Sequence, residues 1–317
     1  MYTPAITIMS KLLVVFFATG QQGSSIIDYV INDSALSKVY KLRAVTRDPS
    51  KPEALALHKR GVEVVKGDMD DKDSLKQAMH GAHTVFAATL TVYDDQMETR
   101  ERAQGRALGD AAVEGGVQYL IFSTLPNTTK ISDGVYTVAS FDVKAETEQY
   151  IRGLPLKSAF FSPGSFMQNY LGMFAPYPVG DGTYAFSNIV SPQAPYPHID
   201  TLGDTGKYVG AILAEPDKYE GKVFSAATKL YTFEEAAQVI SKVTGKDVKY
   251  KQISVDDIKR MMPPIVANNV VPMMKYAEDF GYYGSNTMEL VEWSAQNARG
   301  KLTTLEEFFA KNPINLH

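Results

Sequence analysis

The sequence predicts an α/β protein with a doubly wound parallel sheet and a smaller, mostly helical C-terminal domain. Three observations lead to this fold class. Short apolar runs alternate with helical segments from Lys11 to Ser162, a glycine-containing turn joins the first run to the first helical segment, and the alternation weakens beyond Pro163. A chain of 317 residues is long enough for one large domain and a smaller one.

The elements of the first domain follow in a regular order. Segments with the length and apolar content of buried strands cover 11–17, 41–47, 62–68, 83–89, 118–124 and 156–162. Helices are expected between them, after Gly23 and over 52–59, 73–79, 96–114 and 141–152. Strands and helices in this order form a parallel sheet with both faces covered, and its ligand crevice lies at the carboxyl ends of the strands.

The later part of the chain has a different pattern. Glycine and proline are frequent between Gly172 and Pro197, which predicts loops or a hairpin rather than another strand–helix unit. Helix signals then return over 205–214, at a capping box beginning with Thr232 and closed by Gly245, and at the helix starts Ser254 and Thr303. The pattern leaves open whether residues 199–228 return to the first sheet.

Composition excludes several classes of protein. The net charge is −4 and basic residues are scattered, which argues against direct nucleic-acid contact and against a basic membrane patch. There are no cysteines, and the histidines lack metal-ligand spacing, so we expect no metal site and surface positions for His58, His80, His83, His198 and His317. The residues before Lys11 have no basic start, which predicts a cytoplasmic or nucleocytoplasmic protein without a leader.

The first turn has the character of a phosphate-binding loop in a Rossmann-type domain. An apolar strand enters the turn at Phe17, and a helical pattern follows Gly23 directly. Backbone N–H groups at a helix start bind pyrophosphate where small side chains allow a close approach, so the turn predicts a dinucleotide site at Thr19, Gly20, Gln22 and Gly23. Phe17 stands at the first position of the G-x-x-G-x-x-G spacing. A glycine-bearing turn without a ligand stays open as an alternative.

The ends of the next strands supply further candidates. Arg47 follows the second strand, where a guanidinium would bind a 2′-phosphate, so with Lys51 it favours NADP(H) over NAD(H). Asp68 follows the third strand and either accepts from the adenine amine or caps the next helix. Ala88, at the end of the fourth strand, leaves space for a cofactor. For Arg47 the alternative is a solvated turn beside proline. We therefore expect residues 1–163 to form the NAD(P)-binding domain and residues 164–317 to form the substrate or effector domain.

Lys144 is the candidate for chemistry on the last helix of this domain. A tyrosine four residues before a lysine, whose ammonium lowers the phenol pKa, is the usual proton-transfer pair in short-chain oxidoreductases. Here that position is Ser140, expected to cap the helix, and Tyr136 lies before it. Lys144 is therefore predicted to hold the nicotinamide ribose, with a weaker case for catalysis. The alternative is an exposed lysine paired with Glu148.

Several strings together resemble the NmrA-like family, an atypical branch of the short-chain dehydrogenase/reductase superfamily. They are ATGQQGSS, RAVTRDPSKPEALALHKRGVEVVKGDMDD, FDVKAETEQYIR, SPGSFMQNYL, DTGKYVGAIL and FEEAAQVISKVTGKDVKY, and the resemblance runs from about Lys11 to Asn312. It implies a Rossmann domain with a small, mostly helical second domain. It also implies pyrophosphate binding by the glycine loop, NADP(H) preference through Arg47 and a cofactor role for Lys144. Phe17 and Ser140 depart from the family pattern.

Three functions follow from these features. The first is an NADP(H)-binding, redox-sensing regulator that contacts a protein partner such as a transcription factor, as some members of the family do, and the absence of the Tyr-x-x-x-Lys pair favours it. The second is an NADPH-dependent reductase of a small carbonyl or enone compound, with Lys144, Tyr136 or a pocket tyrosine supplying the proton. The third is a scaffold that has lost nucleotide binding, and Phe17, at the first glycine position of the loop, is the only residue that favours it. The sequence does not indicate an oligomeric state.

Overall fold

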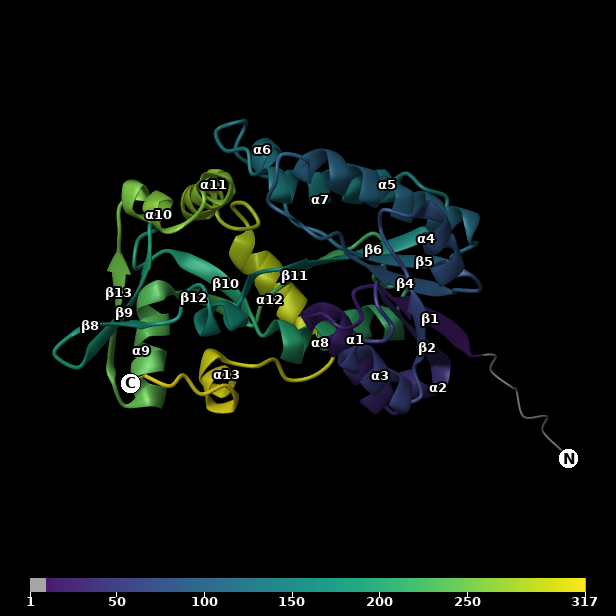
Figure 1. The fold of residues 1–317 in the computed structure, drawn as a ribbon, viewed down its shortest axis with the longest axis horizontal. Coiled ribbons are helices and arrows are strands. Elements are labelled where there is room, and N and C mark those ends of the chain that lie inside the picture. Colours follow the sequence, from purple (N-terminus) through teal and green to yellow (C-terminus); the bar gives the residue numbers. More distant parts are fainter. Residues whose placement is uncertain (1–9, 317) are drawn as a thin grey trace, which may run out of the picture.

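The computed structural model describes residues 10–316 and has a seven-stranded parallel sheet at its centre (Figure 1). The expectation that the chain has no leader and the expected surface position of His317 both concern residues outside this range. The strands are β1 (Lys11–Val15), β2 (Tyr40–Thr46), β3 (Glu63–Lys66), β4 (Thr84–Ala87), β5 (Tyr119–Ser123), β6 (Lys157–Pro163) and β11 (Val223–Ala226). Their order is β11-β6-β5-β4-β1-β2-β3, and every neighbouring pair is parallel. The chain winds outward from β1 to β3 and crosses back to β4, so the strand order reverses beside β1. Ligand crevices form at such a point.

Helices cover both faces of this sheet (Figure 1). One face carries α1 (Gln21–Asn32), α2 (Leu36–Val39), α3 (Pro52–Lys59) and α8 (Thr201–Ala214), and the other carries α4 (Lys72–Met79), α5 (Met97–Glu114) and α7 (Ala139–Arg152). Alternate side chains of β1 enter the two cores, Leu13 and Val15 on the first side and Val14 on the second. The predicted doubly wound parallel fold is confirmed.

Residues after the sixth strand also contribute to the large sheet and to the helices that cover it. Strand β11 pairs with β6, and α8 packs directly on α1. The two helices approach closely: a Cβ at Gly206 would lie 2.4 Å from the Ser25 carbonyl oxygen, and one at Gly210 would lie 2.3 Å from the Tyr29 ring. The Gly206 N–H also donates to Ser25 Oγ at 2.9 Å. The segment 199–228 therefore supplies both a helix and a strand to the large sheet.

The remaining C-terminal residues form helices and two small sheets at one end of the large one (Figure 1). The sheets consist of β7 (Ser165–Phe166), β10 (Pro195–Ile199) and β12 (Lys229–Thr232), and of β8 (Tyr177–Gly180), β9 (Thr183–Asn188) and β13 (Asp247–Gln252). The helices are α9 (Phe233–Thr244), α10 (Val255–Met261), α11 (Pro264–Phe280), α12 (Thr287–Asn297) and α13 (Leu305–Lys311). Strands β8 and β9 are the hairpin expected in this region. The sequence did not indicate β10, in which two of five residues are proline.

Two helix starts differ from their predicted positions. The expected box at Thr303 is displaced by one residue, because the Thr303 N–H and hydroxyl both donate to the buried carboxylate of Asp204, at 2.9 and 3.0 Å. Thr304 caps α13 instead. Helix α8 starts at Thr201 rather than 205, since the Asp200 side chain accepts from the Gly203 N–H. The boxes at Thr232 and Ser254 are confirmed.

His198 corrects the expectation of surface imidazoles, because its side chain is fully buried in the aromatic C-terminal core. Its Nδ1 lies 2.8 Å from the Tyr196 carbonyl oxygen, which can only accept, so Nδ1 carries the proton. Nε2 then accepts from the Tyr170 hydroxyl at 3.1 Å. Burial lowers the pKa of His198 from 6.5 to about 4.

The turn after β1 places a large residue in a strained backbone conformation. Phe17 has φ of 51°, in the left-handed region where glycine is favoured, and its carbonyl accepts the Gly20 N–H at 2.8 Å. The geometry that a first glycine would serve is therefore kept in this chain at the cost of backbone strain. None of the helices within residues 10–316 has the length and hydropathy of a membrane span.

We expect the burial of neutral His198 to make stability depend on pH. Because its folded pKa lies below the unfolded value, the contribution is complete above pH 6.5 and is lost as the pH falls toward 4. Between pH 7 and pH 5 the loss is about 2 kcal/mol. Urea unfolding of wild type and His198→Gln should show that their difference in unfolding free energy narrows by this amount. A constant difference would contradict it.

At position 17 we expect the protein with glycine to be more stable than the protein with alanine, which is the reverse of the usual order. Both Phe17→Ala and Phe17→Gly remove the ring, but only glycine relieves the positive φ, so Phe17→Gly should be more stable by about 1 kcal/mol. Thermal unfolding measures the difference. As a control, exposed Gln149 within the last turn of α7 should show the ordinary order, with alanine more stable than glycine.

Candidate functional site

The glycine loop and the ends of β2 and β3 enclose a pocket of about 260 Å³, here called the glycine-loop pocket. It lies at the carboxyl edge of the sheet, where the strand order reverses. Its lining includes four of the predicted cofactor-binding residues, Thr19, Gly20, Arg47 and Asp68. Lys51 and apolar side chains also line it, among them Phe16, Phe17, Val45, Met69 and Leu90. The structure thus brings Arg47 and Asp68 to the same cavity as the first half of the loop.

Arg47 has a guanidinium that is available to a ligand, since it forms no hydrogen bond or ion pair within residues 10–316. The neighbouring Asp48 does not neutralise it directly, because its carboxylate accepts from the Ser50 hydroxyl at 2.6 Å and N–H at 3.0 Å. These hydrogen bonds lower the pKa of Asp48. Asp68 does not cap α4, which was one expectation for it. Asp71 caps that helix, and Asp68 Oδ1 accepts from the Asp70 N–H.

The residues of the loop fit a phosphate group. A Cβ at Gly23 would lie 2.3 Å from the Phe17 carbonyl oxygen, so this glycine permits the close packing of α1 on β1. Gly20 has more space, with 3.3 Å to the same oxygen, but its N–H is used by the turn. The N–H groups of the first turn of α1 have no helical acceptor. The buried Gln22 Oε1 has no partner among the described residues; as an acceptor it suits a hydroxyl or amide of a ligand rather than its phosphate.

A second cavity, the apolar pocket, opens where β4, β5 and β6 end and where the C-terminal helices approach. Its volume is about 400 Å³. Gln22, Ala88 and Lys144 line it beside a mostly apolar wall that includes Leu125, Phe166, Phe174, Val270, Met274 and Tyr282. Besides Gln22 and Lys144, its polar lining residues are Thr89, Thr91, Tyr93, Ser123, Thr124, Ser165, Asn169 and Asn188, and most of the exposed pocket surface is apolar. Such a cavity suits a small, mainly apolar molecule.

Lys144 is not the exposed surface residue that the alternative interpretation expected, and it does not pair with Glu148. Only 13% of its side chain is exposed, and its ammonium forms an ion pair with Glu101, whose side chain is 1% exposed. Nζ also donates to the Thr89 carbonyl and hydroxyl oxygens, both at 3.0 Å. Burial lowers the pKa of Lys144, against the opposing effect of Glu101. Glu148 instead binds Arg152.

The expected cap of this helix is wrong, and one of the candidate proton donors lies elsewhere. Ser140 does not cap α7, which begins after Val138 without a side-chain cap, and it lies buried inside the first turn. Tyr136 does not reach the apolar pocket: its hydroxyl donates to Asp279 Oδ2 at 2.5 Å, and its ring packs on Phe280.

Sequence reasoning did not single out Glu101, Tyr93 or Asn188. For Glu101 a signal existed, because it falls one turn from Met97 on the face of α5 that also carries Leu108, and a carboxylate on an apolar face needs a partner. Tyr93 lies in a segment without periodicity between β4 and α5. Asn188 ends β9, and its buried Nδ2 has no partner among the described residues. Neither position has a distinguishing pattern.

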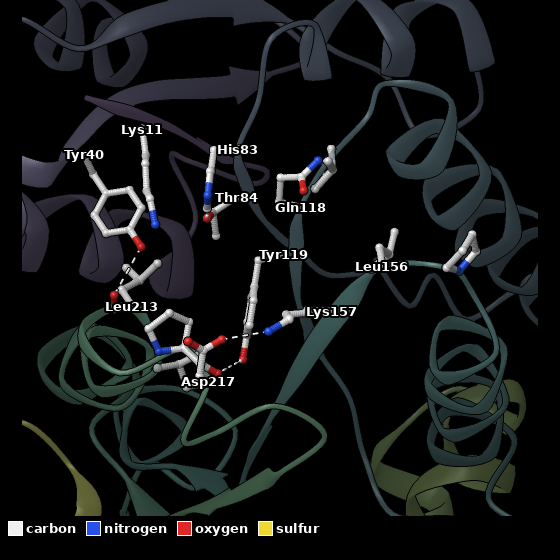
Figure 2. A pocket seen from close by; sticks show the side chains of 14 residues that line it. Lys11, Tyr40, His83, Thr84, Gln118, Tyr119, Leu156, Lys157, Leu213 and Asp217 are labelled. Atoms are coloured by element: carbon white, nitrogen blue, oxygen red, sulfur yellow. Dashed lines mark hydrogen bonds and ion pairs between the residues drawn. The ribbon is translucent and has the colours of Figure 1, made fainter. Parts of the chain in front are cut away.

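The opposite edge of the sheet has a pocket of about 520 Å³ that involves none of the predicted site residues (Figure 2). Lys11, His83 and Lys157 line it at the amino ends of their strands. The hydroxyls of Tyr40 and Tyr119 donate to the carbonyls of Leu213 and Pro216, at 3.1 and 2.8 Å, and so attach the end of α8 to this edge. No group of three or more potential metal ligands occurs in the described part of the chain.

Comparisons with known proteins agree with this architecture. The model of the NmrA-like family matches residues 9–309. An NmrA-like family domain-containing protein of Dictyostelium discoideum is 27% identical over 311 residues, covering 96% of this chain and 98% of its own. The NmrA-like family domain-containing oxidoreductase ptmS of Penicillium ochrochloron is 26% identical, covering 77% and 76%. The crystal structure of NmrA, a negative transcriptional regulator, in complex with NADP superposes with a TM-score of 0.80 at 21% identity, covering 96% and 95%.

The family model covers almost the whole chain, and the seven-stranded sheet has the topology that the resemblance implied. The chain belongs to the NmrA-like family and has its NAD(P)-binding, Rossmann-like fold.

Proposed function

We propose that the protein is an NADP(H)-dependent oxidoreductase that acts on a small, largely apolar carbonyl or enone compound. The observation that carries this proposal is the apolar pocket, which includes Lys144 and has a mostly apolar surface. A pure nucleotide sensor needs no second cavity of this kind. The name oxidoreductase given to relatives such as ptmS supports the same class of reaction.

The dinucleotide would lie along the carboxyl edge of the sheet. In this arrangement Thr19, Gly20, Gln22 and Gly23 surround the pyrophosphate, and Arg47 binds the 2′-phosphate with paired charge-assisted hydrogen bonds. Asp68 accepts from the adenine amine, and Ala88 leaves space beside the nicotinamide half. When bound, the dihydronicotinamide supplies a hydride to the substrate.

Lys144 would contact the nicotinamide ribose at the boundary between the crevice and the apolar pocket. Its ammonium is held by Glu101 and Thr89, so a ribose hydroxyl must replace one of the Thr89 contacts. The buried carboxylate keeps the ammonium in place and charged during this exchange. Ser123 and Thr124 lie close enough to the same wall to orient a substrate oxygen.

The second candidate is an NADP(H)-binding, redox-sensing regulator that contacts a protein partner such as a transcription factor, in the cytoplasm and also in the nucleus. One observation favours it: Glu101 and the two Thr89 oxygens accept all three N–H groups of Lys144, which leaves none free for cofactor or substrate. The fold shared with the regulator NmrA is compatible with this role.

If Arg47 binds the 2′-phosphate, Arg47→Ala should weaken NADP(H) binding about 10- to 100-fold, as expected for losing charge-assisted hydrogen bonds. NAD(H), which lacks this phosphate, should bind with nearly unchanged affinity. Calorimetric titration with all four dinucleotides measures this. Arg106→Ala, an exposed arginine on α5, is the charge-matched control. Equal losses for NADPH and NADH would refute the role of Arg47, and no binding by wild type would indicate a scaffold without nucleotide.

The oxidoreductase proposal is tested by removing the buried ion pair as a unit. Glu101→Leu/Lys144→Met leaves no uncompensated charge, so the fold should persist while NADPH oxidation with cinnamaldehyde or a naphthoquinone slows at least about 100-fold. The control removes an exposed ion pair between the same two helices, Arg102→Met/Glu146→Leu, and should keep wild-type rates. NADPH binding by wild type without turnover of any of these probes would support the regulator instead.

A further inference from the structure

Helix α7 lacks a tyrosine at the position from which a proton would reach the apolar pocket. Ser140 and Lys144 lie one helical turn apart on the same face, and Ser140 is 4% exposed. A serine hydroxyl does not release a proton at neutral pH. The lysine at this site is therefore present without its partner on the helix.

A tyrosine from another segment reaches this position. Tyr93 lies between β4 and α5, lines the apolar pocket with Lys144, and its phenol lies close to the Ser140 side chain. The phenol of Tyr93 thus lies beside residue 140, which is one helical turn from the lysine on α7. The small side chain of the serine at this position leaves room for the ring.

The segment that carries Tyr93 is attached to the core just before it. The Thr89 and Thr91 hydroxyls donate to the two oxygens of Glu101, at 2.6 and 3.0 Å. The same carboxylate holds Lys144. These contacts fix the approach of the segment to α5 and α7, so Glu101 positions the phenol through the two threonines.

We propose that Tyr93 donates the proton to the substrate oxygen during carbonyl reduction, in place of the tyrosine that α7 lacks; this role rests on the proposed oxidoreductase function. The carbonyl carbon gains a hydride supplied by the bound dihydronicotinamide, which is oxidised, and the π electron pair of the carbonyl moves to oxygen. That oxygen takes the Tyr93 proton to give an alcohol. The phenolate regains a proton from water, because Tyr93 is only partly buried.

The other tyrosines are less suited to this role. The Tyr282 hydroxyl donates to the Pro163 carbonyl at 3.3 Å, and the Tyr136 hydroxyl to Asp279 outside the pocket. Tyr196 packs within the aromatic cluster of the C-terminal core. Burial and the charge of Glu101 raise the pKa of Tyr93, which keeps its phenol protonated at neutral pH.

The first test is Tyr93→Phe, which keeps the ring and removes only the hydroxyl. With NADPH and cinnamaldehyde or a naphthoquinone we expect kcat to fall about 10²- to 10⁴-fold, while KM and NADPH affinity change little. Tyr136→Phe is the matched control and should retain wild-type kcat. Wild-type kcat in Tyr93→Phe would overturn the role of Tyr93 alone. No turnover by wild type with any probe would overturn the oxidoreductase proposal, and the role with it.

A second measurement does not depend on turnover. In protein labelled with ¹³C at the hydroxyl-bearing tyrosine carbon, the Tyr93 resonance is identified by its loss in Tyr93→Phe. We expect it to shift in Ser140→Ala and when a naphthoquinone binds the protein without cofactor. Binding of the quinone without a shift would place the phenol away from the substrate oxygen and contradict the proposal. If Tyr93 has only a structural role, its resonance should shift in Ser140→Ala but not when the quinone binds.

Discussion

The buried ion pair between Glu101 and Lys144 joins the three segments that form the reaction end of the crevice. It connects α5 with α7, and through Thr89 and Thr91 it holds the chain that leaves β4. Two charges taken out of water are tolerated only when both are paired and hydrogen-bonded, and here every donor of the lysine has an acceptor. The geometry of the apolar pocket therefore depends on one carboxylate that itself lies outside the pocket lining.

Much of the fold could be predicted because its signals are local. Strand and helix periods, the glycine turn and the boxes at Thr232 and Ser254 each depend on a few neighbouring residues. The shift from Thr303 to Thr304 shows the limit of such signals. Both residues have the required side chain and spacing, and the choice between them is made by Asp204, about a hundred residues earlier. A long-range hydrogen bond decided what the local pattern left equal.

In the candidate site, too, one part could be predicted from the sequence and another could not. Thr19, Gly20, Arg47 and Asp68 gather at one pocket because parallel strands present their carboxyl ends at one edge, which follows from topology alone. The partners of Lys144 could not be obtained in this way. Spacing favoured Glu148 at one helical turn, but Lys144 faces α5, and Glu148 binds Arg152. The direction in which a helix presents a side chain depends on its neighbours in space.

The close contact of α8 with α1 has a consequence for how the chain can be divided. The first six strands and the glycine loop all precede Gly164, which suggests a separable nucleotide-binding unit. In a fragment ending there, however, Ile26, Ile27 and the edge of β6 would lose the apolar cover that α8 and β11 provide. Truncations that cut between these halves would expose this apolar surface and favour aggregation, so the two parts of the sequence fold as one unit.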